Sequence, residues 1–266
     1  LRITGRKDDG YHLLQTVFQF IDLCDWLTFY PVDTDEVTLK DPIPGVPEDQ
    51  DLTVRAALLL KKETGYKGGV CIEVEKNLPM GGGLGGGSSD AATTLVVLNQ
   101  LGGLGLSVQR LMELGVSLGA DVPVFIFGHS AWAEGVGEFL DKIDLPDCWF
   151  VLVKPDCHVV TGEVFCSEDL TRDSKSITID SFMSGQHKND CLDVVQRLYS
   201  PVKKALDELS EFGEARLTGT GACVFVQFED KSAAVDVFDQ LKGPREVYLA
   251  KGMNVSPLHK ELNTLI

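Results

Sequence analysis

A run of fifteen residues from Leu78 to Ala92 is almost without side chains, and it constrains the fold of this chain most strongly. It reads LPMGGGLGGGSSDAA and contains six glycines. Alternating apolar residues over 70–74 predict a strand before the run, and apolar spacing after it predicts a helix from Ala91 to Leu101. Glycine permits positive φ and close approach of a ligand, and a helix start offers free N–H groups. Because two ordered elements enclose the run, it indicates a phosphate-binding loop and not a flexible linker.

Two common phosphate-loop types fit this run poorly. A Walker loop ends in Gly-Lys-Ser/Thr, whereas Gly87 is followed directly by Ser88. The spacing of Gly81, Gly83 and Gly86 matches the dinucleotide pattern, but that unit needs a second strand with an acidic end about 20 residues further on. The chain instead has a glycine-rich turn and a second helix over 109–118, capped by Ser107. We therefore reject both types.

Composition excludes several classes of protein. A chain of 266 residues that is 44% hydrophobic can bury a core as one large domain or two small ones. We find no apolar run near the length of a membrane span and no signal-like start, so we expect a soluble intracellular protein. The net charge of −16, without a cluster of Lys and Arg, argues against a nucleic-acid surface. Seven cysteines without a Cys-x-x-Cys pair are expected to be reduced.

The order of the expected helices and strands changes near Pro146. We place a boundary there between an N-terminal domain, 1–146, and a C-terminal domain, 147–266. In the first part, residues 35–50 indicate a weak strand with exposed turns, and a helix is expected from Asp51 to about Lys62. The second part alternates strands and helices, which favours an α/β sandwich. We expect strands over 150–153, 222–228 and 246–250, and helices over 191–198, 202–209 and 232–241.

Five motifs, in order along the chain, carry a resemblance to a known family. They are Asp9–His12, Pro79–Asn99, Gly119–Phe125, Ala133–Glu138 and Leu217–Cys223. Together they resemble the GHMP kinases, which include galacto-, homoserine, mevalonate and phosphomevalonate kinases, over essentially the whole chain. The resemblance implies an α+β fold of two domains with the active site between them. The N-terminal domain would be like domain 2 of ribosomal protein S5, and the C-terminal domain would be a ferredoxin-like α/β sandwich.

The motifs are most similar to one branch of these kinases. That branch transfers the γ-phosphoryl group of ATP, with Mg²⁺, to the 2-hydroxyl of a cytidine-diphosphate-linked sugar alcohol in the non-mevalonate pathway of isoprenoid biosynthesis. The resemblance implies a small-molecule substrate with a cytidine diphosphate moiety, no nucleic acid or membrane partner, and a monomer or weak homodimer. It also implies the bacterial cytoplasm or the plastid stroma. The metal follows from the charge of ATP, and no ligand set for it is assigned.

Asp121 is the expected catalytic residue. It lies in Gly119-Ala120-Asp121-Val122-Pro123, between a helix end and an apolar run, where a plain turn former is the alternative. The resemblance implies that Asp121 orients the acceptor hydroxyl and takes its proton. An ordinary aspartate is a weak base, but a loose phosphoryl transition state demands little more than late proton acceptance and positioning.

The resemblance also assigns substrate-binding residues. Tyr11 and His12 follow the turn signal Asp8-Asp9-Gly10, and in the family they meet the cytosine, with the tyrosine stacking and the histidine hydrogen-bonding. Phe165 matches the opposing aromatic, although its pattern alone indicates a core residue. An aromatic pair suits a base because every base has a π face. The other expected substrate-binding residues are Val136, Thr161, Gly219, Thr220 and Gly221.

The expected ATP-binding residues lie in and around the glycine run. They are Leu52, Lys76, Pro79, Met80, Gly81, Gly82, Gly83, Leu84, Gly85, Gly86, Gly87, Ser88 and Ser89. Lys76 would otherwise be an ordinary solvated lysine. Two positions depart from the family: Asp51 replaces an asparagine near the adenosine, and Asp90 replaces Asn or Ala after the serine pair. We expect Asp90 in the first turn of the helix, where its charge would compete with phosphate.

The chain begins at Leu1, whereas the family has an upstream strand with a Pro-Ala-Lys-Leu-Asn-like segment. That segment holds a catalytic lysine and a substrate-binding asparagine, so we expect a truncated form that lacks a sheet edge and most of the activity. Two alternatives remain. One is a GHMP kinase for another small alcohol, which Tyr11, His12 and Phe165 argue against. The other is a catalytically silent nucleotide or metabolite binder, which the missing lysine alone supports.

Overall fold

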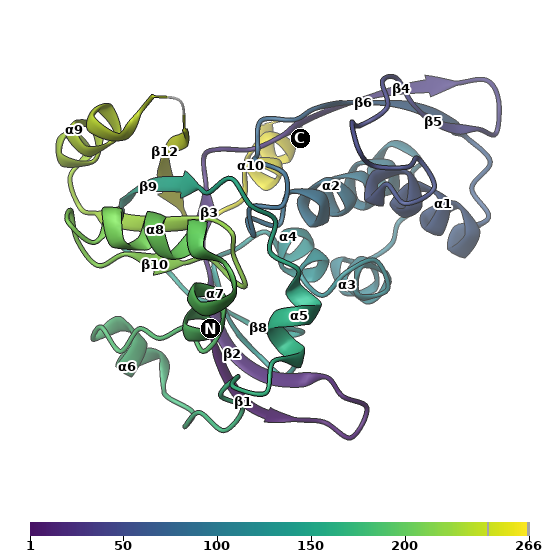
Figure 1. The fold of residues 1–266 in the computed structure, drawn as a ribbon. Helices are drawn as coiled ribbons and strands as arrows, with labels where there is room; N and C mark the ends of the chain where they lie inside the picture. Colours follow the sequence, from purple (N-terminus) through teal and green to yellow (C-terminus); the bar gives the residue numbers. More distant parts are fainter. Residues whose placement is uncertain (244, 265–266) are drawn as a thin grey trace. The chain divides into compact units, whose positions relative to one another are not determined.

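The computed structural model describes residues 1–243 and 245–264 (Figure 1). The chain divides into two compact units, each assembled from segments that are not contiguous in sequence. Unit 1 comprises Leu1–Leu23, Pro79–Leu84 and Ser130–Asn254, and unit 2 comprises Cys24–Leu78, Gly85–His129 and Val255–Ile266. The glycine run is therefore shared between the units. A single domain boundary near Pro146 stays a proposal.

Unit 1 contains a four-stranded antiparallel sheet in the order β1–β2–β7–β8. Its strands are β1 (Arg2–Arg6), β2 (His12–Phe18), β7 (Ala131–Glu134) and β8 (Phe139–Lys142). The turn expected at Asp8-Asp9-Gly10 joins β1 to β2, with Gly10 at φ 92°. The N–H of Lys7 donates to the carbonyl of Tyr11 at 2.7 Å, which closes the hairpin. The hairpin places His12 at the first position of β2.

A second sheet in unit 1 has five strands in the order β10–β11–β9–β12–β3. All of its pairings are antiparallel. The strands are β3 (Phe20–Ile21), β9 (Trp149–Lys154), β10 (Arg216–Leu217), β11 (Val224–Phe228) and β12 (Glu246–Met253). The helices of this unit are α5 (Thr161–Cys166), α6 (Ile179–Met183), α7 (Leu192–Leu198), α8 (Ser200–Leu209) and α9 (Lys231–Leu241).

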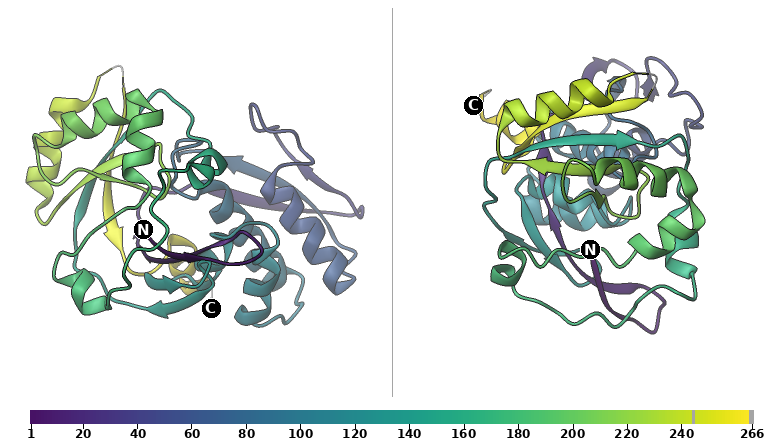
Figure 2. Two further views of the ribbon diagram at one scale, coloured as in Figure 1. Left: turned by 60° about the horizontal axis from the view of Figure 1, so that its bottom comes forward. Right: turned by 60° about the vertical axis from the view of Figure 1, so that its left-hand side comes forward.

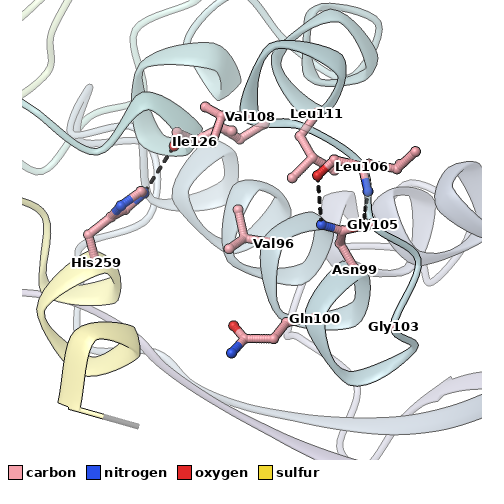
Figure 3. Close-up of a pocket in the computed structure, with 10 residues that line it drawn as sticks. All are labelled: Val96, Asn99, Gln100, Gly103, Gly105, Leu106, Val108, Leu111, Ile126 and His259. Carbon is pink, nitrogen blue, oxygen red and sulfur yellow. Dashed lines mark hydrogen bonds between the residues drawn. The ribbon is translucent and has the colours of Figure 1, made fainter. Parts of the chain in front are cut away.

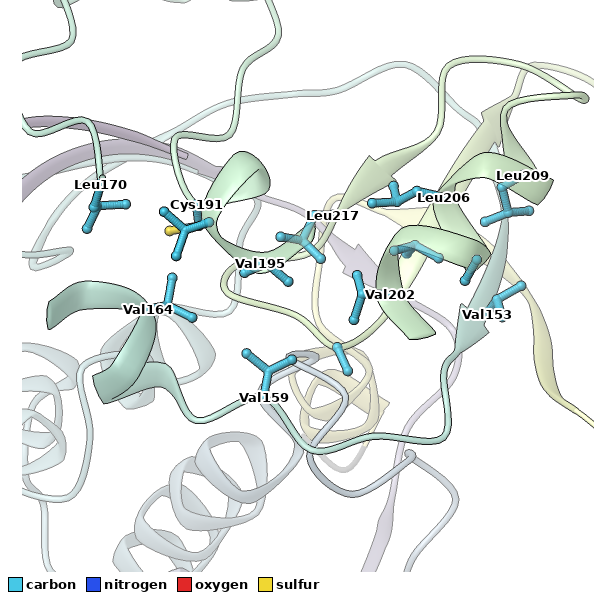
Figure 4. Close-up of a cluster of buried hydrophobic side chains, with 14 of the residues drawn as sticks. Val153, Val159, Val164, Leu170, Cys191, Val195, Val202, Leu206, Leu209 and Leu217 are labelled. Atoms are coloured by element: carbon cyan, nitrogen blue, oxygen red, sulfur yellow. The ribbon is translucent and has the colours of Figure 1, made fainter. Parts of the chain in front are cut away.

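The two faces of the five-stranded sheet are buried in different ways. Side chains alternate along a strand, so Val151 and Val153 of β9 share one face. On that face, α8 (green) and α9 (yellow-green) pack against the strands (Figures 1 and 2). Figure 4 shows the main apolar cluster there, in which Val195, Val202 and Val164 are fully buried. Phe150 and Leu152 point to the opposite face and form a smaller cluster with Leu84.

Unit 2 is built from a three-stranded sheet and five helices among its described residues. The sheet order is β4–β6–β5, with β4 (Trp26–Val32), β5 (Val37–Leu39) and β6 (Gly69–Glu75). The helices are α1 (Leu52–Thr64), α2 (Gly86–Leu101), α3 (Val108–Val116), α4 (Val122–Phe127) and α10 (Pro257–Thr264). Leu60, Ile72, Leu95 and Ile126 are fully buried in one cluster, to which the sheet and helices α1 to α4 contribute.

The expected α+β class is confirmed, and so are nearly all of the expected helices and strands. The helix after the glycine run is the main correction, because α2 begins at Gly86 and not at Ala91. The expected cap of α3 is correct, since the hydroxyl of Ser107 accepts the N–H of Arg110 at 3.2 Å. All seven cysteines are free thiols, as expected. Among the described residues, no helix combines the length and the apolar character needed to cross a membrane.

Candidate functional site

In unit 2, the last two glycines of the run, Gly86 and Gly87, lie in the first turn of α2. Gly85 occupies the N-cap with φ 71°, and its lack of a side chain leaves the helix without a side-chain cap. The first N–H groups of an α-helix have no partner within the helix, and within the described part of the chain those of Gly86, Gly87 and Ser88 have no other backbone acceptor. A helix of sixteen residues adds the positive end of its dipole at this point. This helix start can therefore bind an anionic group, as phosphate requires.

In unit 1, the first part of the glycine run packs against the turn between β10 and β11. The N–H of Cys223 donates to the carbonyl of Gly82 at 2.9 Å, and the hydroxyl of Thr218 donates to that of Gly83, also at 2.9 Å. In both bonds the acceptor is a backbone carbonyl group of the glycine run. The expected motif Gly219–Gly221 thus lies beside the expected phosphate loop, and its role with a ligand stays a prediction.

Gly83 is the position where only glycine fits. Its φ is +72°, and a Cβ built there would lie 2.4 Å from the carbonyl oxygen of Gly221 and 3.0 Å from the hydroxyl of Thr218. A side chain would force both backbone segments apart, because the nearest atom is backbone and cannot rotate away. Gly82 is similarly enclosed, with a Cβ 2.7 Å from the sulfur of Cys223.

Lys76 leads into the glycine run and is not an ordinary solvated lysine. Its ammonium contacts the carboxylates of Asp25 and Asp90, the latter at 2.9 Å, and only 21% of its side chain is exposed. The second oxygen of Asp25 accepts the N–H groups of Asn77 and Leu78, each at 2.7 Å. Asp25 therefore fixes the end of β6, and Lys76 joins that end to α2.

Asp90 differs from its expected position and role. It is the fifth residue of α2, since the helix begins earlier than expected, so the prediction that it lies in the first turn is wrong. Its side chain is 5% exposed and faces Lys76. Desolvation, with smaller contributions from the charges of Asp25 and Asp51, raises the pKa of Asp90 to about 6 against the opposing effect of Lys76.

The pKa values of Lys76 and Asp90 are both raised, but for different reasons, because two carboxylates share one ammonium. Desolvation lowers the pKa of Lys76, but the charge of Asp90 and the hydrogen bond and charge of Asp25 outweigh it, so the pKa is raised. The lysine therefore stays protonated near neutral pH. The raised pKa of Asp90 means that this carboxylate takes up a proton at a higher pH than an ordinary aspartate does.

Asp121 lies at the N-cap of α4, immediately after the loop that ends α3. Its φ of −87° and ψ of −12° are helical, and within the described residues its carboxylate makes no side-chain cap bond. Part of the residue is open to solvent, but crowding by protein atoms desolvates the carboxylate and raises its pKa. A Cβ on Gly119, in the same loop, would lie 3.6 Å from the hydroxyl of Ser88. The loop that carries Asp121 thus lies next to the start of α2.

Asp51 shows how a departure from the family pattern is accommodated. One oxygen of its buried carboxylate accepts the N–H groups of Thr53 at 2.8 Å and Val54 at 3.2 Å, which caps α1. Either aspartate or asparagine can make these bonds. Leu52 opens the helix, and its Cδ1 would lie 3.4 Å from a Cβ on Gly87. Leu52 is therefore close to the start of α2, while a contact with adenosine stays a prediction.

Two of the expected substrate-binding residues, His12 and Phe165, form a stacked pair in unit 1, and Tyr11 directly precedes His12 in the chain. The rings of His12 and Phe165 are stacked, with centroids 5.0 Å apart and planes 28° apart. Tyr11 is adjacent and 64% exposed. Desolvation and the charges of Arg172 and Arg6 lower the pKa of His12, which favours the neutral imidazole. An exposed tyrosine beside a stacked pair is available to a planar ligand.

The remaining substrate-binding predictions fall on turns and helix ends of unit 1. The hydroxyl groups of Thr161 and Thr220 are hydrogen-bonded at 2.9 Å, so α5 and the β10–β11 turn meet there. Val136 lies in the turn between β7 and β8, where its N–H donates to Glu138 at 2.5 Å. Pro79, Met80, Gly81 and Leu84 also belong to unit 1.

A groove of about 410 Å³ occurs in unit 2, and none of the residues above is part of its lining (Figure 3). Two of its polar side chains already serve the fold. Asn99 exchanges two hydrogen bonds with the backbone of Leu106, and Nε2 of His259 lies 3.0 Å from the carbonyl oxygen of Ile126. No expected site residue lines the groove. We therefore do not assign it to the nucleotide.

No group of three or more His, Cys, Asp or Glu side chains suited to a metal ion occurs within residues 1–243 and 245–264. Any metal that accompanies a nucleotide would depend on the phosphate oxygens for much of its coordination.

Two functional candidates escaped the sequence analysis. Asp25 lies 51 residues before Lys76, and Arg172 lies 160 residues after His12, so no local pattern connects either pair. An isolated Asp in a loop and an isolated Arg in a polar segment are common surface residues. Only the folded chain brings them to the predicted site residues.

Comparison with known proteins identifies two family models in the chain. Residues 51–129 match the model described as the GHMP kinases N terminal domain. Residues 172–244 match the model described as GHMP kinases C terminal.

Curated relatives are similar to the chain over almost its whole length. A 4-diphosphocytidyl-2-C-methyl-D-erythritol kinase from Methylococcus capsulatus is 54% identical over 264 residues, covering 99% of this chain and 91% of the relative. A protein of the same name from Nitrosococcus oceani is 52% identical, covering 97% of this chain and 92% of the relative. One from Pseudomonas aeruginosa is 50% identical, covering 100% and 94%.

Solved structures also resemble the chain. A crystal structure of 4-(cytidine 5'-diphospho)-2C-methyl-D-erythritol kinase matches with a TM-score of 0.82 and 29% identity, covering 94% of each chain. A mevalonate kinase from Methanococcus jannaschii matches with a TM-score of 0.64 at 14% identity, covering 93% of this chain and all of that one. At this identity the second likeness concerns the fold alone.

Proposed function

The chain belongs to the 4-diphosphocytidyl-2-C-methyl-D-erythritol kinases within the GHMP kinases, and from this membership we propose that it transfers the γ-phosphoryl group of ATP to the 2-hydroxyl of 4-diphosphocytidyl-2-C-methyl-D-erythritol. This reaction belongs to the non-mevalonate pathway of isoprenoid biosynthesis. The named relatives come from bacteria, which supports the bacterial cytoplasm over the plastid stroma as its location.

The observation that supports this acceptor is the stacking of His12 on Phe165, with the exposed Tyr11 directly before His12 in the chain. A pyrimidine base needs a flat apolar surface and a polar edge, and this group offers both. A kinase for a small alcohol without a base would have no use for such a surface, which argues against that alternative.

The start of α2 and the segment Gly81–Gly83 are the residues that we propose for the phosphates of ATP. Free N–H groups and the positive helix end suit an anion, and Gly83 has no room for a side chain. These features fit a nucleotide with its Mg²⁺, which would neutralise charge on the phosphates. Because the buried Asp90 is paired with Lys76, its charge is partly neutralised beside this anion-binding position.

Asp121 is the residue that we propose to orient the acceptor hydroxyl and to accept its proton. Desolvation raises the pKa of its carboxyl, so it holds a proton more firmly than an ordinary aspartate. Phosphoryl transfer through a loose transition state needs that proton to be accepted late, and positioning matters more than base strength.

Release of ADP tests this proposal. The assay supplies Mg²⁺-ATP and 4-diphosphocytidyl-2-C-methyl-D-erythritol, to this chain and to a form extended at its N-terminus with the corresponding segment of the Methylococcus capsulatus relative. We expect acceptor-dependent ADP release in at least one of the two forms, lowered at least about 100-fold by Asp121→Asn. Binding of ATP without ADP formation in either form would favour the silent binder, and release with another alcohol alone would assign a different acceptor.

A further inference from the structure

Arg172 is held in one orientation by four hydrogen bonds within unit 1. One terminal nitrogen donates to the carbonyl oxygens of Phe165 at 2.9 Å and Ser167 at 2.8 Å, and the other donates to that of Leu170 at 3.1 Å. The remaining nitrogen, Nε, donates to Nε2 of His12 at 3.1 Å. The guanidinium is therefore fixed against the segment that follows α5, and it carries Nε–H to the ring of His12.

This bond determines where the proton of His12 lies. A guanidinium can only donate hydrogen bonds and does not lose its proton in proteins. Nε2 of His12 must therefore be the acceptor, which requires a neutral imidazole with its proton on Nδ1. The lowered pKa of His12, caused by desolvation and by the charges of Arg172 and Arg6, agrees with this neutral form.

The opposite nitrogen of His12 is available to a ligand. Among the described residues, Nδ1 of His12 has no hydrogen-bond partner, and the ring stacks on Phe165 next to the exposed Tyr11. His12 thus presents a single N–H donor at the aromatic surface. Without Arg172, the neutral ring could place its proton on either nitrogen and present a donor or an acceptor.

We propose that Arg172 is a specificity-determining residue that fixes His12 as an Nδ1–H donor and thereby makes the protein select cytosine over uracil. The inference rests on the proposed function, in which the base of the acceptor lies at His12. Position 3 of cytosine is a bare nitrogen that accepts a hydrogen bond, whereas position 3 of uracil carries an N–H. A fixed donor therefore pairs with cytosine and leaves two N–H groups facing each other with uracil.

The size of the effect follows from the cost of a mismatched buried donor. Leaving a buried donor unpaired costs about 1–3 kcal/mol, which corresponds to roughly 5–150-fold in binding. Arg172 does not contact the base in this scheme, so it is a positioning residue that acts through His12. A purely structural role at the three carbonyl groups would weaken both substrates equally and leave their ratio unchanged.

Two acceptors test the inference. They share the same methylerythritol, and one carries cytidine diphosphate whereas the other carries uridine diphosphate. We compare kcat/KM for both in the wild type, Arg172→Met, Arg172→Lys and Arg197→Met. Arg197 is a matched control because it donates to the hydroxyl of Ser167 in the same segment and makes no bond to His12. We expect Arg172→Met to lower the preference for cytidine about 5–150-fold, mainly through KM, Arg172→Lys to restore part of it, and Arg197→Met to leave it unchanged.

Nitrogen NMR of His12 provides a second readout that does not depend on turnover. Two-bond ¹H–¹⁵N correlations distinguish the two neutral tautomers, and the His12→Asn variant assigns the signals. We expect the Nδ1–H form in the wild type and a mixture in Arg172→Met. An Nε2–H form in the wild type, or an unchanged cytidine preference in a folded Arg172→Met variant, would overturn the inference. If neither this chain nor the N-terminally extended form acts on either acceptor, the proposed function on which the inference rests is refuted instead.

Discussion

The variant Asp90→Asn tests the buried charge cluster at the start of α2. Asparagine has the shape of aspartate and keeps an oxygen for Lys76, but it removes the second carboxylate that shares this lysine. The pKa of Asp90 is raised from 3.8 to about 6. A carboxyl whose pKa is raised on folding stabilises the fold below its unfolded pKa, and this contribution is lost as the pH rises through its folded pKa.

The shift amounts to about two pKa units, which at 1.36 kcal/mol per unit is about 3 kcal/mol in the free energy of unfolding. We therefore expect the stability of Asp90→Asn, relative to the wild type, to increase by about 3 kcal/mol between pH 3, which is below the unfolded pKa, and pH 8. Urea unfolding followed by far-ultraviolet circular dichroism at a series of pH values measures this difference. Asp193→Asn is the matched control, because Asp193 is an exposed aspartate in the first turn of α7. A difference for Asp90→Asn that is flat with pH, or that falls, would refute the reasoning.

Three further variants test the site. Asp121→Asn should lower kcat at least about 100-fold in an ADP-release assay while the KM for ATP changes little, and a kcat near that of the wild type would exclude Asp121 as proton acceptor. Gly83→Ala should raise the KM for ATP at least about tenfold. Gly45→Ala is the control and should not raise it, because Gly45 has a similar φ of +79° but open space around it. Equal effects would show that close packing at Gly83 is irrelevant. Tyr11→Ala should raise the KM for the acceptor roughly 5–150-fold with kcat unchanged, since stacking on a base contributes about 1–3 kcal/mol; an unchanged KM, measured in the same assay, would contradict a stacking role.

Local patterns predicted the parts of this fold that depend on local chemistry. The strand β6, the turn at Gly10 and the cap at Ser107 all follow from spacing and residue type. The start of α2 did not, because glycines have low helix propensity and Gly86 and Gly87 nevertheless form the first turn. Leu78 and Leu52 lie close to this turn, since a Cβ built on Gly86 would lie 3.5 Å from Leu78 and one on Gly87 would lie 3.4 Å from Leu52.

In the candidate site too, some residues could be predicted from local patterns, whereas their distant partners could not. The residues of the glycine run and Asp121 could be named because their types and spacing are unusual. The partners that determine their charge and position could not, since Asp25 and Arg172 act across long stretches of chain. Lys76 illustrates the difference, because a lysine after a strand is ordinarily solvated, and only its two buried carboxylate partners reveal its structural role.

The most direct measurement is ³¹P NMR of a reaction that contains the protein, Mg²⁺-ATP and 4-diphosphocytidyl-2-C-methyl-D-erythritol. If the account is correct, the γ-phosphate signal of ATP declines as ADP appears, and one new phosphomonoester signal couples to carbon 2 of the methylerythritol. Consumption of ATP at the same rate without the acceptor, or a phosphomonoester on a different hydroxyl, would contradict the proposed function.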